Sequence, residues 1–137
     1  MPELTYEKTQ LAKDPNTPQE TLEILATDGN YAVRCFVAEN PNTPRETLKV
    51  LATDEYYSVR CWASVNPNIP QETLKVLATD ENFYVRRCVA RNPNTPPEIL
   101  EVFATDEDSY VRYGVAKNPN ATELIRRLVL MTNEQHS

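Results

Sequence analysis

The sequence predicts an all-α solenoid, that is, a stack of short helical repeats without a β-sheet. The first observation is a 26-residue period in the tripeptide Asn-Pro-Asn, which begins at Asn40, Asn66, Asn92 and Asn118. An altered first copy begins at Asp14. The second observation is a helical spacing of apolar residues within each copy, and the third is eleven prolines that fall where strands would be interrupted. Because one such unit is too short to bury a core, about five copies must stack on each other.

The first helical segment of each copy is short. It follows a Thr-Pro pair, as in Thr43-Pro44-Arg45-Glu46, which predicts a threonine cap, proline in the first helical position and a glutamate reaching back to the cap. Ile69 replaces the threonine in the third copy, which predicts a weaker helix start there. The apolar residues Leu48, Val50 and Leu51 fit either a short α-helix or a 3₁₀-helix.

The second helical segment has a clearer α-helical period. Val33, Phe36 and Val37 occur at i, i+3 and i+4, which predicts that they face the core. The later copies repeat the spacing with Val59, Trp62 and Ala63, then with Val85, Cys88 and Val89. The segment should end at each Asn-Pro step, because proline disfavours helical geometry in the residue before it.

The repeat predicts a single solenoid domain over residues 1–137. Residues 1–14 form an N-terminal cap or partial repeat, residues 15–118 form four full repeats, and residues 119–137 form a C-terminal capping helix and tail. We expect the capping helix at about residues 122–131, with a polar outer side, because terminal repeats face water. Residues after Thr132 should be disordered or loosely held.

The recurring unit Val-Arg-x-x-Val-Ala-x-Asn-Pro-Asn-Thr-Pro-x-x-x-Leu-x-x-Leu-Ala resembles the leucine-rich repeat variant family over about residues 11–131. The resemblance implies a right-handed superhelix of alternating α- and 3₁₀-helices, and HEAT-like helical repeats are close relatives. The founding member of the family carries an iron–sulfur cluster on a separate cysteine-rich N-terminal segment. The sequence here contains no such segment, so we expect no cofactor.

Composition narrows the function. The net charge of −6 and the pI near 4.8 oppose a general binder of nucleic acid or anionic membranes, because such binders need a basic field. Two glycines exclude glycine-rich phosphate loops. No apolar run is long enough to span a membrane, and the polar N-terminus lacks a signal-peptide core. We expect a soluble cytoplasmic protein.

The cysteines and the histidine give no sign of a catalytic or metal site. Cys35 and Cys61 occupy the same position one period apart, and packed helices lie roughly 8–10 Å apart, beyond the ~7 Å limit for a disulfide. Cys88 is one residue out of that register and should point elsewhere. Free thiols and no metal are therefore expected. His136, the only histidine, lies in the tail, and the sequence predicts no enzyme.

Polar positions that repeat in every copy should serve the stacking. The asparagines of each Asn-Pro-Asn should hydrogen-bond turn backbone that proline leaves unpaired. A second set predicts an arginine–aspartate ladder that joins neighbouring repeats, made by Arg34, Arg60, Arg86 and Arg112 with Asp28, Asp54, Asp80 and Asp106. The alternative is an arginine row that binds phosphate, which the acidic neighbours oppose.

Positions that vary between copies should carry specificity. A helical wheel puts four such columns on the side opposite Val33, and tyrosine, arginine and scattered apolar residues there are typical of protein-binding surfaces. The candidate binding residues are Tyr31, Tyr57, Cys61, Val65, Phe83, Tyr84, Arg87, Arg91, Tyr110, Tyr113 and Lys117.

These candidates predict a non-catalytic scaffold that binds an unidentified protein or peptide. The chain should be a monomer or self-associate weakly through the aromatic face. Two alternatives stay open: the rings fill grooves between helices, or a local basic patch binds nucleic acid. That patch would use Arg86, Arg87, Arg91, Lys117, Arg126 and Arg127.

Overall fold

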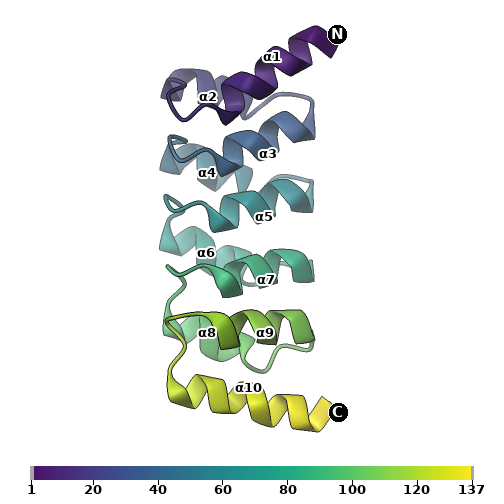
Figure 1. Cartoon of the computed structure of the whole chain (residues 1–137), viewed down its shortest axis with the longest axis vertical. Helices are drawn as coiled ribbons and strands as arrows, with labels where there is room; N and C mark the ends of the chain where they lie inside the picture. The colour runs from purple at the N-terminus through teal and green to yellow at the C-terminus, as the bar shows by residue number, and fades with distance from the viewer. Residues whose placement is uncertain (1, 137) are drawn as a thin grey trace.

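The computed structural model describes residues 2–136 and contains ten α-helices and no strand in that part of the chain (Figure 1). The all-α prediction is confirmed. The helices are α1 (Pro2–Lys13), α2 (Gln19–Leu25), α3 (Tyr31–Glu39), α4 (Arg45–Leu51), α5 (Tyr57–Val65), α6 (Gln71–Leu77), α7 (Phe83–Arg91), α8 (Pro97–Phe103), α9 (Ser109–Lys117) and α10 (Glu123–His136).

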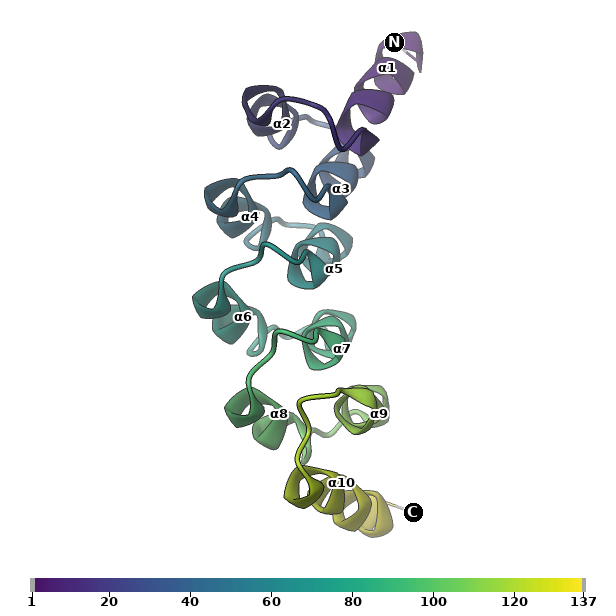
Figure 2. The ribbon, with the colours of Figure 1, turned by 60° about the vertical axis from the view of Figure 1, so that its left-hand side comes forward.

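The helices form two rows, as Figure 2 shows. The longer helices α3, α5, α7 and α9 pack directly on one another, with α1 at the start of their row. The shorter helices α2, α4, α6 and α8 pack mainly on the long row rather than on each other. Because the long row is the closely packed one, the stack bows and the long helices lie along its inner curve (Figure 2).

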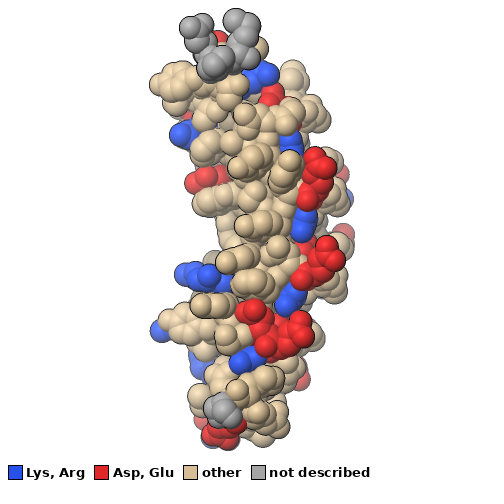
Figure 3. Space-filling model, turned by 90° about the vertical axis from the view of Figure 1, so that its right-hand side faces the viewer, with Lys and Arg blue, Asp and Glu red and all other residues tan. Residues whose placement is uncertain are grey.

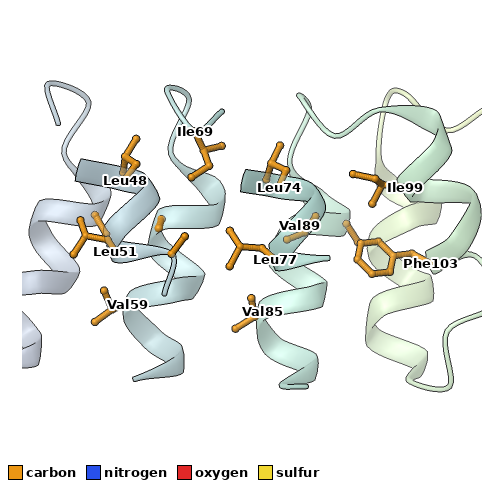
Figure 4. Packing of buried hydrophobic residues seen from close by; sticks show 14 of the residues in the cluster. Leu48, Leu51, Val59, Ile69, Leu74, Leu77, Val85, Val89, Ile99 and Phe103 are labelled. Atoms are coloured by element: carbon orange, nitrogen blue, oxygen red, sulfur yellow. The ribbon is translucent and has the colours of Figure 1, made fainter. Parts of the chain in front are cut away.

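The core lies between the two rows and runs without a break along the stack (Figure 4). Each short helix contributes at least two buried apolar residues, as Leu48 and Leu51 do for α4, and each long helix contributes others, such as Val59. Val50, which the apolar pattern grouped with these leucines, points away from the core with 60% of its surface exposed. A helix of seven residues makes about two turns and presents only one side to the core.

The short helices are α-helices. Each spans seven residues, so the choice between α and 3₁₀ that the sequence leaves open is resolved, and the alternation implied by the family resemblance is not found. Bonds of the 3₁₀ kind occur only at their ends. The amide N–H of Thr27 donates to the carbonyl of Ile24 at 3.2 Å, and that of Asp28 donates to Leu25 at 3.1 Å.

The predicted threonine cap is wrong. Pro44 itself is the N-cap of α4 and no side chain caps the helix, because the Thr43 hydroxyl donates backwards to the carbonyl of Val37 at 2.6 Å. The same bond joins Thr95 to Val89. The threonine therefore ties the loop to the end of the preceding long helix, and in the third copy buried Ile69 takes this place with packing alone.

The last helix is longer than expected and its outer side is not uniformly polar. Helix α10 continues through His136, whose ring nitrogen lies 2.9 Å from the carbonyl of Thr132, and the side chains after Thr132 are exposed. Leu124, Leu130 and Met131 are also exposed. The prediction placed the helix end too early because no proline or glycine stops the helix there. In residues 2–136 no helix combines the length and the apolar character needed to cross a membrane.

Candidate protein-binding face on the inner curve

The repeated asparagines join each repeat to the one before it by hydrogen bonds. The side-chain amide of Asn66, which is 2% exposed, donates to the carbonyls of Ala38 and Asn40 at 2.7 and 2.9 Å. Its oxygen accepts the N–H of Asn68 at 2.9 Å and so holds the turn. The second asparagine also reaches back, since Asn68 donates to Pro41 at 2.6 Å. The predicted bonds to turn backbone exist, but most of them join two repeats.

The first copy shows why its sequence differs. Asp14 stands where later copies have the buried asparagine, and its carboxylate accepts the N–H of Asn16 at 2.9 Å, as the turn requires. No described repeat precedes it, so no carbonyl there needs an amide donor. An acid, which can only accept when ionised, therefore suffices at this end.

The arginine–aspartate ladder is present, and its paired side chains are largely but not fully buried. Arg34 makes two bonds to the Asp54 carboxylate, from Nε at 2.7 Å and from a terminal nitrogen at 3.2 Å, and it also donates to the carbonyl of Asp28. Arg60 pairs in the same way with Asp80. Each arginine thus joins its own repeat to the following one, and this two-bond geometry suits guanidinium far better than ammonium. These bonds use three of the five N–H groups of Arg34, and the Asp54 carboxylate beside it repels anions, so the arrangement disfavours phosphate binding by this row.

The ladder ends on different partners. At the N-terminal end the Lys8 ammonium lies 2.8 Å from the Asp28 carboxylate. At the C-terminal end Arg112 donates to the side-chain oxygen of Asn133 at 2.7 Å. Figure 3, which views the edge where the long helices begin, shows acidic and basic side chains side by side along the stack. Between its two ends the ladder consists of the same arginine–aspartate pair at each junction, so it does not distinguish one repeat from another. Residues that confer specificity for a partner must lie on another surface.

The inner face is the solvent-facing side of α3, α5, α7 and α9, and it holds all the candidate binding residues. Eight of them are exposed: Tyr31, Tyr57, Val65, Tyr84, Arg91, Tyr110, Tyr113 and Lys117. Cys61, Phe83 and Arg87 are partly buried. Cys61 and Phe83 also pack against the core, so groove filling describes these two and not the set as a whole.

Aromatic rings form a row across three neighbouring repeats of the inner face. Tyr57 stacks on Tyr84 with ring centroids 5.8 Å apart, and Tyr84 stacks on Phe83 at 4.2 Å. Phe83 in turn stacks on Tyr110 at 6.4 Å, and the Arg87 guanidinium lies 5.6 Å from the Tyr110 ring. The row presents ring edges and faces to solvent while its members hold each other in place.

A separate aromatic pair lies on the second and third repeats. Tyr31 stacks on Tyr56 at 4.9 Å, and the ladder residue Arg34 lies 5.6 Å from the Tyr56 ring. Tyr56 stands where Asn30, Asn82 and Asp108 cap the other long helices, and it provides no side-chain cap. Neither the caps nor this ring was predicted, although the change from Asn to Tyr at one period marks the position.

The inner face is hollowed between α5 and α7. The hollow has a volume of about 560 Å³, and its walls include Tyr57, Trp62, Val65, Tyr84 and Arg91. Trp62, predicted to face the core, is 42% exposed and forms one wall instead. The helical wheel erred because the i+3 position lies at the boundary of the buried stripe, where a large ring extends into solvent.

The hollow exists because one column of residues changes size along the stack. The column reads Phe36, Trp62, Cys88 and Gly114, one residue for each long helix. Cys88 of α7 lines the hollow between α5 and α7. Its side chain is small, whereas the equivalent position of α5 holds the large side chain of Trp62. At Gly114 a side chain would come within 3.1 Å of Ala90, so α9 approaches α7 closely there. Size variation in a single column therefore shapes the face.

Cys88 points toward Cys61, contrary to the prediction that it points elsewhere. Both thiols are free, partly buried and line the hollow. The Cys61 thiol, which hydrogen-bonds Cys88, lowers the pKa of Cys88 to about 7, and Ser64 and two arginines add to this against the effect of burial. The same contact raises the pKa of Cys61. The one-residue change of register places the two sulfurs side by side on adjacent helices.

The basic residues of the inner face are available to a partner. Among residues 2–136 no carboxylate lies within ion-pair distance of Arg87, Arg91 or Lys117, whereas Arg34, Arg60 and Arg86 are all paired. Lys117 lies 5.4 Å from the Tyr113 ring. Basic atoms also appear along the left edge of Figure 3 in the lower half of the stack. The described residues contain no group of three or more His, Cys, Asp or Glu side chains suited to a metal ion.

Comparison with known proteins agrees with the repeat chemistry. The family model described as leucine rich repeat variant matches residues 31–55 and 85–108. No curated protein and no solved structure matches the chain. Each matched segment begins within a long helix, crosses an Asn-Pro-Asn turn and ends just after the next short helix. It therefore contains one arginine and one aspartate of the ladder, one buried asparagine and the buried residues of one short helix. The family model thus matches two of the repeats, in agreement with the family that the repeated motif resembles.

Proposed function

We propose that the chain is a non-catalytic scaffold whose inner face binds an extended segment of a protein partner. The observation that carries the proposal is the hollow between α5 and α7, which combines exposed rings with arginines that have no ion-pair partner among the described residues. A soluble protein rarely exposes a contiguous apolar patch without using it. Aromatic and arginine side chains are also the residues that contribute most to binding energy at interfaces.

The chemistry of the face specifies an acidic segment with one aromatic or aliphatic anchor. The anchor would enter the hollow and pack on Trp62 and Tyr84. Acidic side chains on either side of it would pair with Arg87, Arg91 and Lys117. An acidic partner would be attracted to the local basic patch of the inner face. Because the protein as a whole carries a net charge of −6, the rest of its surface would repel the same partner.

Nucleic acid is the weaker candidate for the same face. Three cations face the inner curve, while the acidic residues Glu55, Glu81 and Glu107 lie exposed at the helix starts beside it. Tight phosphate-backbone binding needs many cations and shows a steep dependence on salt. A protein segment needs only the few pairs that are available here.

Peptide selection tests the proposal. A random peptide display library is selected on the wild type alone, and the selected peptides are then titrated against Cys88→Trp, which places on α7 the ring that α5 carries at Trp62. Because the fold accepts tryptophan in this column, the variant should fold while its hollow is filled. We expect peptides rich in Asp and Glu around an aromatic or aliphatic residue, with affinity for Cys88→Trp at least tenfold weaker, as for loss of a central anchor contact.

Two controls make the result decisive. Cys88→Ser keeps the hollow open and should bind the selected peptides like the wild type. A labelled single-stranded RNA is titrated at two salt concentrations in the same assay. Selected peptides that bind Cys88→Trp as tightly as the wild type would refute the site, and strong salt-sensitive RNA binding lost in Arg87→Gln would favour nucleic acid instead.

A further inference from the structure

We infer that Cys88 and Cys61 form a reactive dithiol site that exchanges with small anionic disulfides, of which oxidised glutathione is an example. The two thiols line the same open hollow from α7 and α5, and they are close enough to share a hydrogen bond. Nothing in the packing requires two adjacent thiols, since the other copies hold Phe36, Trp62 and Gly114 in the column of Cys88. The site does not depend on which macromolecule the inner face binds.

The surroundings of Cys88 favour its thiolate. Arg87 and Arg91 carry positive charge on the same helix, and both line the hollow. Across the hollow, α5 offers the Cys61 thiol as a hydrogen-bond donor, and this interaction, with the charges of Arg87 and Arg91, lowers the pKa of Cys88. The thiolate is the form of cysteine that attacks disulfides, and its nucleophilicity falls as the pKa of the thiol falls. A thiol with a pKa near the ambient pH therefore reacts well, because much of it is ionised and the thiolate keeps most of its nucleophilicity.

The exchange proceeds in two balanced steps. The Cys88 thiolate attacks one sulfur of the small disulfide, a bond forms between them, and the other half leaves as a thiolate that takes up a proton. Cys61 then loses its proton to solvent and attacks the Cys88 sulfur, which expels the second half of the reagent. The two protein thiols are oxidised to one disulfide that links α5 to α7, and the reagent is reduced to two thiols.

Cys35 is a natural control within the same chain. It occupies the position of Cys61 one period earlier and lies 3.7 Å from the Ser58 hydroxyl. Its pKa is raised, first by burial and also by the charges of Asp54 and Glu39. Glu39 stands in the column where Arg91 stands two periods later. Equivalent helices thus place one cysteine beside acids and another beside arginines.

Alkylation rates test the reactivity of Cys88. The full chain is treated at pH 7 with neutral iodoacetamide or with anionic iodoacetate, and each cysteine is followed by peptide mass spectrometry. We expect Cys88 to react roughly tenfold or more faster than Cys35. Its rate with iodoacetate relative to iodoacetamide should exceed that of Cys35, and Arg87→Gln with Arg91→Gln should remove this preference while circular dichroism stays unchanged.

Exposure to oxidised glutathione tests the pair. The wild type should lose two hydrogens and yield a peptide pair linked through Cys61 and Cys88, whereas Cys61→Ala should stop at a glutathione adduct on Cys88. Equal alkylation of Cys88 and Cys35, or a glutathione adduct distributed over all three cysteines, would overturn the inference.

Discussion

The repeated edges and the inner face belong to the same long helices, yet they use their polar residues in opposite ways. At the edges, Arg60 is paired with Asp80 and Asn66 is buried, and the same arrangement returns in each neighbouring repeat. On the inner face, Arg87 and Arg91 differ from the residues one period away and have no ion-pair partner among residues 2–136. Repetition therefore marks residues that hold the stack together, and variation marks those to which we assign binding in the proposed function. Substitutions can test this division.

The largest effect is expected for Asn66→Asp. The new carboxylate would be buried against the carbonyls of Ala38 and Asn40 that now receive the amide, so repulsion and burial of charge add to the lost bonds. We expect a loss of about 3–5 kcal/mol in the free energy of unfolding. The converse change, Asp14→Asn, should shift it by less than about 0.5 kcal/mol, because that position is exposed and faces no earlier repeat. Urea denaturation measures both.

Arg60→Ala should be the next largest. It leaves the Asp80 carboxylate, whose side chain is 11% exposed, without its guanidinium partner and should cost about 1–3 kcal/mol. The matched control is Lys49→Ala, which removes an exposed pair with Glu46 and should change stability by less than about 0.5 kcal/mol. Equal melting temperatures for the two variants would contradict the structural role of the ladder.

The N-terminal end of the ladder should respond to pH. The pKa of Asp28 is lowered, chiefly by the hydrogen bond from Lys8 and then by the N–H of Asn30. A carboxyl group whose pKa is lower in the folded state stabilises the fold at pH values above its pKa in the unfolded chain, which is near 3.9. This stabilisation is lost as the pH falls through the lower pKa of the folded state. Lys8→Met should therefore be less stable than the wild type at pH 7, and this difference should shrink as pH falls below about 4. A difference that is constant with pH would exclude the carboxylate as its source.

Apart from the control variants, the smallest effect on stability is expected for Tyr110→Ala on the inner face. The ring is exposed and stacks only at the end of the aromatic row, so its loss should cost less than about 1 kcal/mol. Binding of the selected peptides should weaken at the same time, which calorimetric titration would show. A large loss of stability without a change in binding would move Tyr110 from the binding face to the scaffold.

The sequence predicts the stack well because its causes are local and repeated. The 26-residue period, the helix ends before each proline and the Arg–Asp pairs all depend on residues at fixed spacing, and the structure contains them. The Thr43 bond was predicted in the wrong direction, because a hydroxyl near a helix start can either accept from that helix or donate to the one before. Spacing alone does not separate these two.

The inner face was predicted in composition but not in shape. The exposed rings were placed correctly by the helical wheel, since they lie opposite Val33. The hollow and the meeting of Cys61 with Cys88 depend on contacts between successive helices, which no single helix reveals. The signal that could have found them is the decrease in size from Trp62 to Cys88 to Gly114 down one column.

The asparagine bonds and the arginine–aspartate ladder join neighbouring repeats in opposite directions along the chain, so the stack can gain or lose a whole repeat. Each asparagine reaches back one repeat and each arginine reaches forward one, so every junction is closed from both sides by identical chemistry. Removal of residues 41–66 would set Arg34 opposite Asp80 and leave both ends as they are. A gain or loss of one period, as by gene duplication, would therefore alter the extent of the recognition surface without requiring any new contact inside the protein.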